Sequence, residues 1–303
     1  MAVWSAPGKV FLFGEHAVVY GKPGIAMAIK PRVYVTVRKT RHPPRVKSPY
    51  LEKCFELMGV NGSVYIHSQL PSSSGLGSSA AVTVATLSAI NDEFDLGYGR
   101  PEIATMAHSV EKSVQKGRAS ATDTYVSTFG GVLLIQGGDI KRRLPPEDFH
   151  LVIGNTMVSH STARMVEQVG KFRATDPDIV NPILDAIEAV TMRSLHVFQD
   201  QRALGGRYMD INHELLEALG VGGHPALTRL VTAARAAGGA YGAKITGAGG
   251  GGSIVALCPK RSKSKIAGAI EGCDGRAIIT TIDNEGARKE KEDERNRTDK
   301  TRR

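Results

Sequence analysis

The most informative stretch of this chain is rich in glycine and serine: Pro71-Ser-Ser-Ser-Gly75-Leu-Gly77-Ser78-Ser79-Ala-Ala81. Its glycines let the backbone approach a ligand closely, and it leads directly into an Ala- and Val-rich segment that predicts a buried helix over 78–91. The first turn of a helix offers free N–H groups and a positive dipole, which together bind phosphate. Ser78 and Ser79 could cap this helix, or their hydroxyls could reach a phosphate or its Mg²⁺. We therefore predict a phosphate site here, with an ordinary serine-capped loop as the alternative.

This loop differs from the two commonest nucleotide-binding loops. No lysine follows its second glycine, so it is not a Walker loop. Gly75-Leu-Gly77 also lacks the third glycine of a dinucleotide-binding fingerprint. A nucleotide bound at this loop must therefore be held by a different scheme.

Two more segments stand out, one near each end of the chain. Residues 2–13 predict a strand that runs into a glycine turn carrying Glu15 and His16. Residues 247–252 hold five glycines in six positions and lead into the apolar run 254–257. We interpret the second segment as a fixed turn beneath a ligand; a flexible turn is the alternative.

The remaining pattern alternates strands and helices, which predicts a two-domain α/β or α+β protein. We expect domains at 1–147 and 148–283, divided near Pro145 and Pro146, and a disordered charged tail at 284–303 because that segment is too polar to fold alone. A Pro- and Arg-rich loop is expected at 42–49. The predicted strands are 33–39, 63–68, 130–135, 151–154 and 276–282, and the other predicted helices are 101–116, 161–173, 178–200, 207–219, 224–238 and 266–271.

Composition narrows the classes of function. The 303 residues are 41% hydrophobic, enough for a sizeable core, and carry a net charge of +9. Aromatic content is 6%, which disfavours a nucleic-acid surface built on stacking, whereas a positive field suits anionic substrates. Three widely separated cysteines have no metal-binding spacing and indicate reduced thiols. No apolar run approaches the roughly 20 residues of a membrane span. We expect a cytoplasmic protein that binds neither nucleic acid nor membrane.

The three segments, in this order, resemble the GHMP kinase superfamily over residues 2–282. Its members carry an N-terminal motif, a Pro-x3-Gly-Leu-Gly-Ser-Ser-Ala-Ala phosphate loop and a C-terminal glycine-rich motif. The resemblance implies an α+β two-domain GHMP kinase fold, with an N-terminal domain like ribosomal protein S5 domain 2, a C-terminal α+β domain and the active site in the cleft between them. It also implies ATP and Mg²⁺ as cofactors.

The first segment chooses a branch of the superfamily. Ala6-Pro-Gly-Lys9, followed by Gly14-Glu-His-Ala-Val-Val-Tyr-Gly21, resembles the mevalonate kinases of the short archaeal type, whereas galactokinases share Gly-Glu-His but continue differently. This resemblance implies transfer of the γ-phosphate of ATP to the C5 hydroxyl of (R)-mevalonate, a step of isoprenoid biosynthesis, and a homodimer. The alternatives are another GHMP kinase acting on homoserine or a sugar, or a non-catalytic relative that only binds ligands.

The same resemblance assigns residues to roles. It implies Asp123 as the catalytic base and Lys9 beside it, although an isolated aspartate would more often be a turn residue and an isolated lysine a solvated one. It implies Ser79 and Glu111 as Mg²⁺ ligands. Mevalonate is expected at Glu15, His16, Thr246, Gly247 and Ala248. A charged His16 could face the carboxylate, and either Glu15 or His16 could bond the C3 hydroxyl. Thr246 could bond mevalonate or orient the glycine loop. Arg164 is left open between closing the site and lying on the surface. The ATP phosphates are expected at Pro71, Ser72, Ser73, Ser74, Gly75, Leu76, Gly77, Ser78, Ser79, Ala80 and Ala81.

Overall fold

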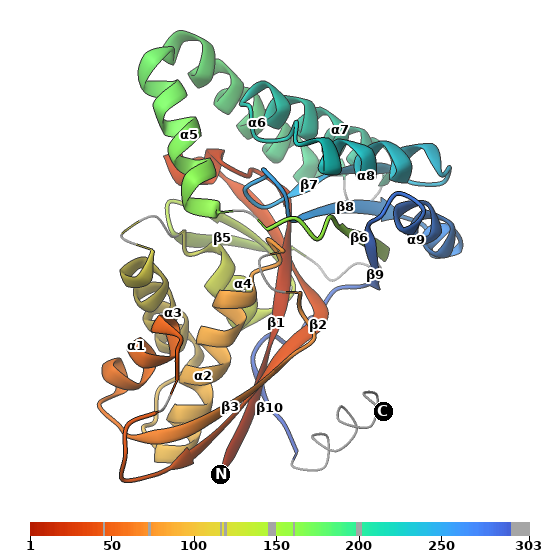
Figure 1. The fold of residues 1–303 in the computed structure, drawn as a ribbon. Coiled ribbons are helices and arrows are strands. Elements are labelled where there is room, and N and C mark those ends of the chain that lie inside the picture. Colours follow the sequence, from red (N-terminus) through yellow and green to blue (C-terminus); the bar gives the residue numbers. More distant parts are fainter. Residues whose placement is uncertain are drawn as a thin grey trace.

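A computed structural model describes residues 1–44, 46–71, 74–115, 117, 120–144, 150–159, 161–197 and 202–291. Figure 1 shows two sheets, one above the other, each with helices packed against it. The strands β1 (Ala2–Phe13) and β2 (Gly24–Lys39) form a long antiparallel hairpin that rises from the lower domain to the upper one. The hairpin therefore connects the cores of both domains.

The lower sheet has the order β10-β1-β2-β4-β5, with β3 paired to β2. The β1–β2 ladder shifts register between Pro7 and Gly8. Such a bulge bends a strand and redirects the side chains that follow it, and here Lys9 is the next residue. The other strands of this sheet are β3 (Gly62–Ser68), β4 (Val132–Gln136), β5 (Asp139–Leu144) and β10 (Arg288–Lys289).

Helix α2 (Ser78–Phe94) is the centre of the lower helical layer. Most of its residues are buried, because it packs on β1 and β2 and is flanked by other helices. A helix that is apolar nearly all round is stable only in such a position. Its neighbours are α1 (Pro49–Met58), α3 (Arg100–Val114) and α4 (Thr122–Phe129).

The upper domain is built on a second antiparallel sheet, of order β7-β8-β6-β9, with its own hydrophobic core. Its strands are β6 (His150–Asn155), β7 (Gly242–Thr246), β8 (Ser253–Cys258) and β9 (Arg276–Thr280). Its helices are α5 (Thr162–Thr175), α6 (Pro177–Val197), α7 (Arg202–Ala218), α8 (Pro225–Ala236) and α9 (Lys263–Glu271), with short 3-10 turns at η1 (Ala17–Tyr20) and η2 (Lys260–Ser262).

The predicted helices and strands of both domains are confirmed to within a few residues, but some elements were missed. The strand predicted over 33–39 begins at Gly24, and the chain forms the helices α1 and α4 and the strand β5 where none was expected. The expected boundary at Pro145–Pro146 and the predicted helix end at 198–200 lie outside the described residues, so the division into domains stays a prediction. Among the described helices, none is long and apolar enough to cross a membrane.

The segment 281–290, here called the C-terminal strap, corrects the prediction of a disordered tail from residue 284. The strap leaves the upper domain after β9 and reaches the lower sheet, where Ile282 bridges to Ile29 of β2 and β10 pairs with β1 (Figure 1). Ala287 N–H also donates to Thr128 O, at 3.1 Å. The strap is ordered because its backbone finds partners in the lower domain, which a composition argument does not detect. Residues 292–303 lie outside the described residues.

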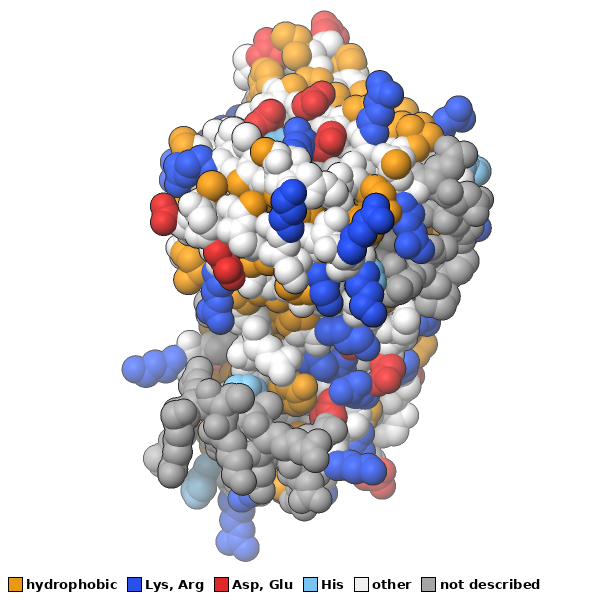
Figure 2. All heavy atoms as spheres, turned by 90° about the vertical axis from the view of Figure 1, so that its right-hand side faces the viewer, with side chains coloured by type: hydrophobic (Ala, Val, Ile, Leu, Met, Phe, Trp, Pro, Cys, Tyr) orange, Lys and Arg blue, Asp and Glu red, His pale blue; other side chains and the backbone are white. Residues whose placement is uncertain are grey.

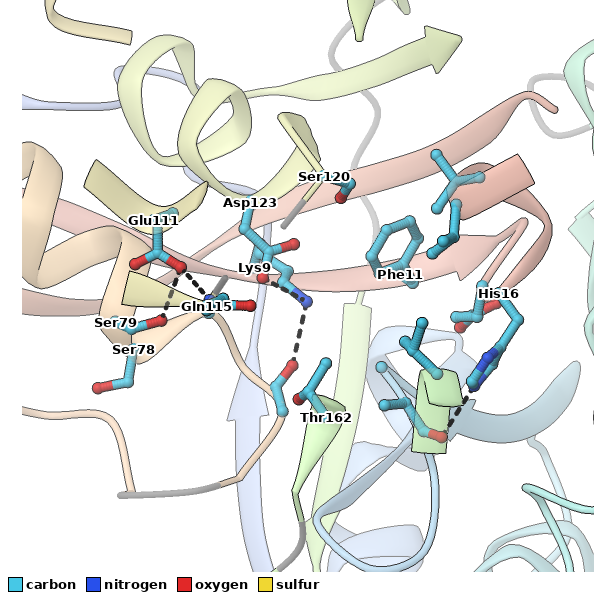
Figure 3. Close-up of a pocket in the computed structure, with 18 of the residues that line it drawn as sticks. Lys9, Phe11, His16, Ser78, Ser79, Glu111, Gln115, Ser120, Asp123 and Thr162 are labelled. Carbon is cyan, nitrogen blue, oxygen red and sulfur yellow. Dashed lines mark hydrogen bonds and ion pairs between the residues drawn. The ribbon is translucent and has the colours of Figure 1, made fainter. Parts of the chain in front are cut away.

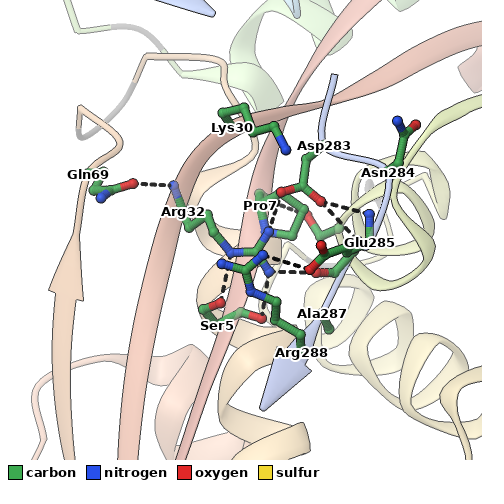
Figure 4. Close-up of polar contacts among 12 residues, drawn as sticks. Ser5, Pro7, Lys30, Arg32, Gln69, Asp283, Asn284, Glu285, Ala287 and Arg288 are labelled. Atoms are coloured by element: carbon green, nitrogen blue, oxygen red, sulfur yellow. Dashed lines mark hydrogen bonds and ion pairs between the residues drawn. The ribbon is translucent and has the colours of Figure 1, made fainter. Parts of the chain in front are cut away.

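Arg32 anchors the strap from inside the lower domain (Figure 4). Its guanidinium is buried, forms an ion pair with Asp283 and donates to Gly286 O at 2.5 Å. It also donates to Ser5 Oγ at 2.7 Å, and that hydroxyl donates to Glu290 Oε1 at 2.5 Å. Residues of the strap thus neutralise the buried charge of Arg32, which lies in the lower sheet.

Ending the chain at Ile282 is expected to lower the free energy of unfolding by about 3–5 kcal/mol, because Arg32 would become an unpaired buried charge. A chain ending at Lys291 is the matched control and should unfold like the full-length protein. Chemical denaturation of the three chains measures the difference. Equal stability of the Ile282 and Lys291 chains would contradict this account of the strap.

Candidate active site

A cavity of about 310 Å³ lies between the two domains and is lined from both of them (Figure 3). Most of the sequence-predicted site residues line it: Lys9, Glu15, His16, Ser74, Gly75, Gly77, Ser78, Ser79, Glu111, Asp123, Gly247 and Ala248. The lining residues that sequence reasoning missed are Phe11, Val18, Val19, Gln115, Ser120, Thr162 and Val166. The upper domain therefore contributes a wall through the start of α5 and through the glycine loop after β7.

Lys9 and Asp123 form an ion pair at the centre of this cavity. The distance from Lys9 Nζ to Asp123 Oδ2 is 3.2 Å, and Nζ also donates to Gly75 O at 3.2 Å. The ammonium lies 4.8 Å from the ring centroid of Phe11, a cation–π contact. Lys9 is almost fully buried, whereas the Asp123 side chain is 32% exposed and open to the cavity. The arrangement offers a partly exposed carboxylate beside a fixed cation.

Local structure explains this placement. Asp123 lies in the first turn of α4, where the positive end of the helix dipole favours a carboxylate. Gly77 has φ +71, and a Cβ atom there would lie 2.8 Å from Lys9 Cγ. Glycine at this position therefore allows both the left-handed turn and the passage of the Lys9 side chain beneath it.

The loop before α2 presents helix N–H groups to the cavity. Gly77 is the N-cap of α2, and no side chain of the described residues caps that helix. Ser78 and Ser79 lie inside its first turn instead, so the alternative of an ordinary serine-capped loop is not supported. Pro71 lies outside the lining, and Leu76, Ala80 and Ala81 are packed in the core. Ser72 and Ser73 lie outside the described residues.

Glu111 is a buried carboxylate at the α2 side of the cavity, surrounded by hydrogen-bond donors. It accepts from Ser79 Oγ at 3.3 Å, from Thr83 Oγ1 at 3.4 Å and from Gln115 Nε2 at 2.6 Å. Burial, followed by the nearby charge of Asp123, raises the pKa of Glu111 to about 7. A cation between the two carboxylates would relieve both effects.

This group of side chains fits Mg²⁺. The ion takes oxygen ligands and typically uses one or two protein carboxylates together with phosphates and water. Glu111 and the adjacent Ser79 hydroxyl supply that set at the edge of the cavity. Within the described residues, no three His, Cys, Asp or Glu side chains gather into a metal cluster, so a dedicated transition-metal centre has no support there.

The raised pKa of Glu111 predicts a pH dependence of stability in the absence of Mg²⁺ and nucleotide. A carboxyl whose pKa moves from its ordinary 4.5 to about 7 on folding favours the folded state most below pH 4.5. That contribution, about 3 kcal/mol, is lost as the pH rises through 7. Glu111→Gln should remove this slope when unfolding free energies are measured from pH 4 to 8.

Glu56→Gln, which removes an exposed carboxylate from α1, is the control for this experiment and should follow the wild-type profile. A Glu111→Gln profile parallel to that of the wild type would show that the carboxyl of Glu111 is not responsible for the slope.

Glu15 and His16 occupy the other end of the cavity. Glu15 is buried, pairs with Lys244 Nζ and accepts from Asn212 Nδ2 at 3.3 Å. His16 Nε2 lies 2.9 Å from Ala248 O, and because a carbonyl only accepts, Nε2 carries the proton. Burial lowers the pKa of His16, so the ring is neutral and its Nδ1 is an acceptor. The expected contact between a charged His16 and a substrate carboxylate is therefore not supported.

Thr246 and Arg164 lie outside the cavity lining. Thr246 Oγ1 accepts from Phe11 N–H at 2.8 Å and lies 3.3 Å from Phe11 O, so it joins β7 to β1. Of its two predicted roles, the structure favours orienting the glycine loop over contacting a substrate. Arg164 is exposed near the start of α5, in agreement with its surface alternative.

Some of the missed residues left a signal in the sequence. Gln115 lies four residues after Glu111 on the same helical face, a spacing that brings the two side chains together. Lys244 stands in the otherwise apolar strand Gly242–Thr246, where a buried lysine requires a partner. Thr162 and Val166 left none, because only the tertiary fold brings α5 over the cavity.

Basic side chains are prominent on the outer surface. Figure 2 shows many Lys and Arg side chains across the middle of one face, with fewer Asp and Glu between them. This distribution accords with the net charge of +9. The resulting positive potential raises the local concentration of small anions.

Comparison with known proteins supplies the family. A model of the GHMP kinases N terminal domain matches residues 46–131, one of the GHMP kinases C terminal domain matches 197–273, and the galactokinase galactose-binding signature matches 2–39. The chain is 38% identical to the mevalonate kinase of Pyrococcus abyssi, over 94% of this chain and 96% of that one. It is 41% identical to the mevalonate kinase of Archaeoglobus fulgidus, over 84% and 91%.

A solved structure agrees with these relatives. The crystal structure of the Methanococcus jannaschii mevalonate kinase superposes with a TM-score of 0.80 at 27% identity, over 93% of this chain and 98% of that one. The fold and the cavity define a class of kinases in which the active site lies in a cleft between two domains and the phosphate-binding loop leads into the start of a helix. The chain belongs to the GHMP kinase family and, within it, to the mevalonate kinases. The predicted GHMP kinase fold is thereby confirmed.

Proposed function

We propose that this chain transfers the γ-phosphate of ATP to the C5 hydroxyl of (R)-mevalonate and releases (R)-5-phosphomevalonate, a step of isoprenoid biosynthesis. The observation that carries the proposal is the Lys9–Asp123 pair, 3.2 Å apart, between the start of α2 and the neutral His16. A phosphate site, a base and a hydroxyl-binding group thus share one cavity. The identity of 38–41% to mevalonate kinases over most of the chain supports the choice of substrate.

In this reaction Asp123 accepts the proton of the C5 hydroxyl as its oxygen attacks the γ-phosphorus in line. Lys9 stabilises the negative charge that develops on the attacking and transferred oxygens, without itself accepting the proton. Its contacts with Asp123 and Gly75 hold the ammonium in place before the substrates bind. The transfer is direct and forms no phosphoenzyme.

The N–H groups at the start of α2 and the preceding loop, from Ser74 onward, bind the ATP phosphates. Ser79 and Glu111 would hold Mg²⁺, which would supply positive charge to the bound nucleotide phosphates. Gln115 keeps one Glu111 oxygen oriented toward this position through its 2.6 Å hydrogen bond.

Mevalonate occupies the end of the cavity near His16. The Nδ1 atom of the neutral ring accepts a hydrogen bond from the C3 hydroxyl, and the backbone of Gly247 and Ala248 contributes to the same wall. Thr246 acts from behind this wall through its contact with the Phe11 backbone. Glu15 lines the cavity, but its carboxylate oxygens contact Lys244 and Asn212.

A coupled ADP-release assay with Mg²⁺-ATP tests the proposal. Mevalonate should support turnover with the expected 5-phosphate product, identified by ³¹P NMR. Galactose is the specific rival, because the galactokinase galactose-binding signature matches residues 2–39. Homoserine completes the panel. Robust turnover of galactose or homoserine with none of mevalonate would overturn the proposal.

We further propose that the protein is a homodimer and acts in the cytoplasm. The family resemblance supports the first statement, and the free cysteines Cys54, Cys258 and Cys273 support the second. Light scattering of the purified chain measures the oligomeric state, and a monomer at all accessible concentrations would refute the dimer.

A further inference from the structure

Lys244 is a fully buried lysine just behind the substrate end of the cavity. It lies in β7, has 0% exposure, pairs with Glu15 and donates to Ile245 O at 2.6 Å. Lys244 itself does not line the cavity, but Glu15 does. The ion pair therefore connects a strand of the upper domain to a carboxylate at the wall of the site.

The same contacts fix the backbone that presents His16. Asn212, on α7, donates to Glu15 Oε2 at 3.3 Å and accepts from Gly14 N–H at 3.4 Å. His16 has φ +61, a strained conformation for a residue with a side chain, so it persists only where surrounding contacts enforce it. The tethers of residues 14–16 through Lys244, Asn212 and Ala248 all come from the upper domain.

Charge gives Lys244 a second role. Among the residues that the structure describes, the charged groups lining the cavity are one cation, Lys9, and the three carboxylates Glu15, Glu111 and Asp123. Figure 3 shows Glu111 at the far side of the cavity from His16, with Lys9 and Asp123 between them. Lys9 compensates Asp123, and a bound Mg²⁺ would compensate Glu111, but neither lies next to Glu15. The carboxylate next to His16 is balanced by Lys244. Without that cation, an unpaired negative charge would face an anionic substrate across a poorly solvated wall.

We infer that Lys244 is a positioning residue for substrate binding: by pairing with Glu15 across the domain boundary, it holds the His16 turn in place and cancels the charge that would repel a carboxylate substrate. This inference rests on the proposed function. It also gives Glu15 a part different from the expected one, because a carboxylate engaged by both Lys244 and Asn212 supports the wall instead of bonding the substrate.

The test compares Lys244→Met, Glu15→Gln and the double variant Glu15→Gln/Lys244→Met. We expect Lys244→Met to raise KM for mevalonate at least tenfold while KM for ATP changes less than threefold. The double variant, which has neither charge, should recover most of this loss. A purely structural role for Lys244 predicts that kcat and both KM values change together, without a selective rise in KM for mevalonate. Lys22→Met is the matched control, because Lys22 forms interdomain ion pairs with Asp185 and Glu188 away from the cavity.

Glu15→Gln separates the two parts that Glu15 could play, and it needs no folded Lys244→Met protein. Support of the wall predicts less than a threefold rise in KM for mevalonate, because the amide oxygen of a glutamine side chain at this position still accepts from Lys244 and keeps the turn in place. Direct substrate contact predicts a rise comparable to that of Lys244→Met, which would overturn the inference. Equal KM values for Lys244→Met and the wild type would also overturn it. A wild-type enzyme with no mevalonate turnover would refute the proposed function, and this inference with it.

Discussion

Asp123→Asn is expected to lower kcat by about 10³-fold or more, within the roughly 10²–10⁴-fold range that positioned acid–base groups contribute. The amide is nearly isosteric but cannot accept the proton of the attacking hydroxyl. ATP binding should be nearly unchanged, because the phosphate site at the start of α2 is a separate part of the cavity. Single-turnover phosphoryl transfer with saturating substrates measures the chemical step, and calorimetric titration with a non-hydrolysable ATP analogue measures binding.

The same variant makes a second, independent prediction. The charge of Asp123 is one cause of the raised pKa of Glu111, so its removal should lower the pH at which Glu111 ionises. Asp139→Asn, at an exposed position in β5, is the control for both measurements. Near-normal turnover of Asp123→Asn would refute the assignment of the base.

Lys9→Met should reduce kcat by about 10²–10³-fold, the loss measured elsewhere for a single preorganised group that stabilises transition-state charge. Methionine fills a similar volume beneath Gly77 but offers neither charge nor hydrogen bonds to Asp123 and Gly75. Because the charge develops during transfer, we expect kcat to fall much more than KM for mevalonate rises. Steady-state kinetics with each substrate varied in turn measures this difference.

Lys53→Met removes an exposed lysine from α1 and should retain wild-type kinetics, which controls for the change in net charge. A variant Lys9→Met that binds both substrates weakly but keeps its kcat would assign Lys9 to ground-state binding instead of catalysis.

The sequence alone predicted the phosphate-binding part of the site, because that part depends on glycines and on the start of a helix. The loop around Gly75 and Gly77 had to adopt left-handed turns before a helix, and this requirement is local. Lys9 and Asp123, by contrast, lie 114 positions apart in the chain, and only the family resemblance joined them. Their ion pair depends on the bulge in β1 and on α4, a helix of only eight residues that was not predicted.

Long-range pairing accounts for most of the remaining errors. The strap reads as polar, yet Arg32 and the edge of β1 provide partners that make it part of the fold. The sequence suggested that Glu15 binds the substrate. In the structure Glu15 instead pairs with Lys244, which lies 229 positions away in the chain. Composition and periodicity describe what a segment prefers by itself. They do not describe which distant charge will satisfy it.

The strap also determines when this chain can finish folding during its synthesis. β1, which is made early, is the sheet partner of β10, the last strand among the described residues. Arg32 is made early, but Asp283 and Glu290 reach it only after the whole upper domain has been translated. An N-terminal domain usually completes its fold before the next domain emerges. The lower domain of this protein cannot do so, because part of its sheet follows the upper domain in the chain. Its lower domain stays open at one edge until the strap has been made.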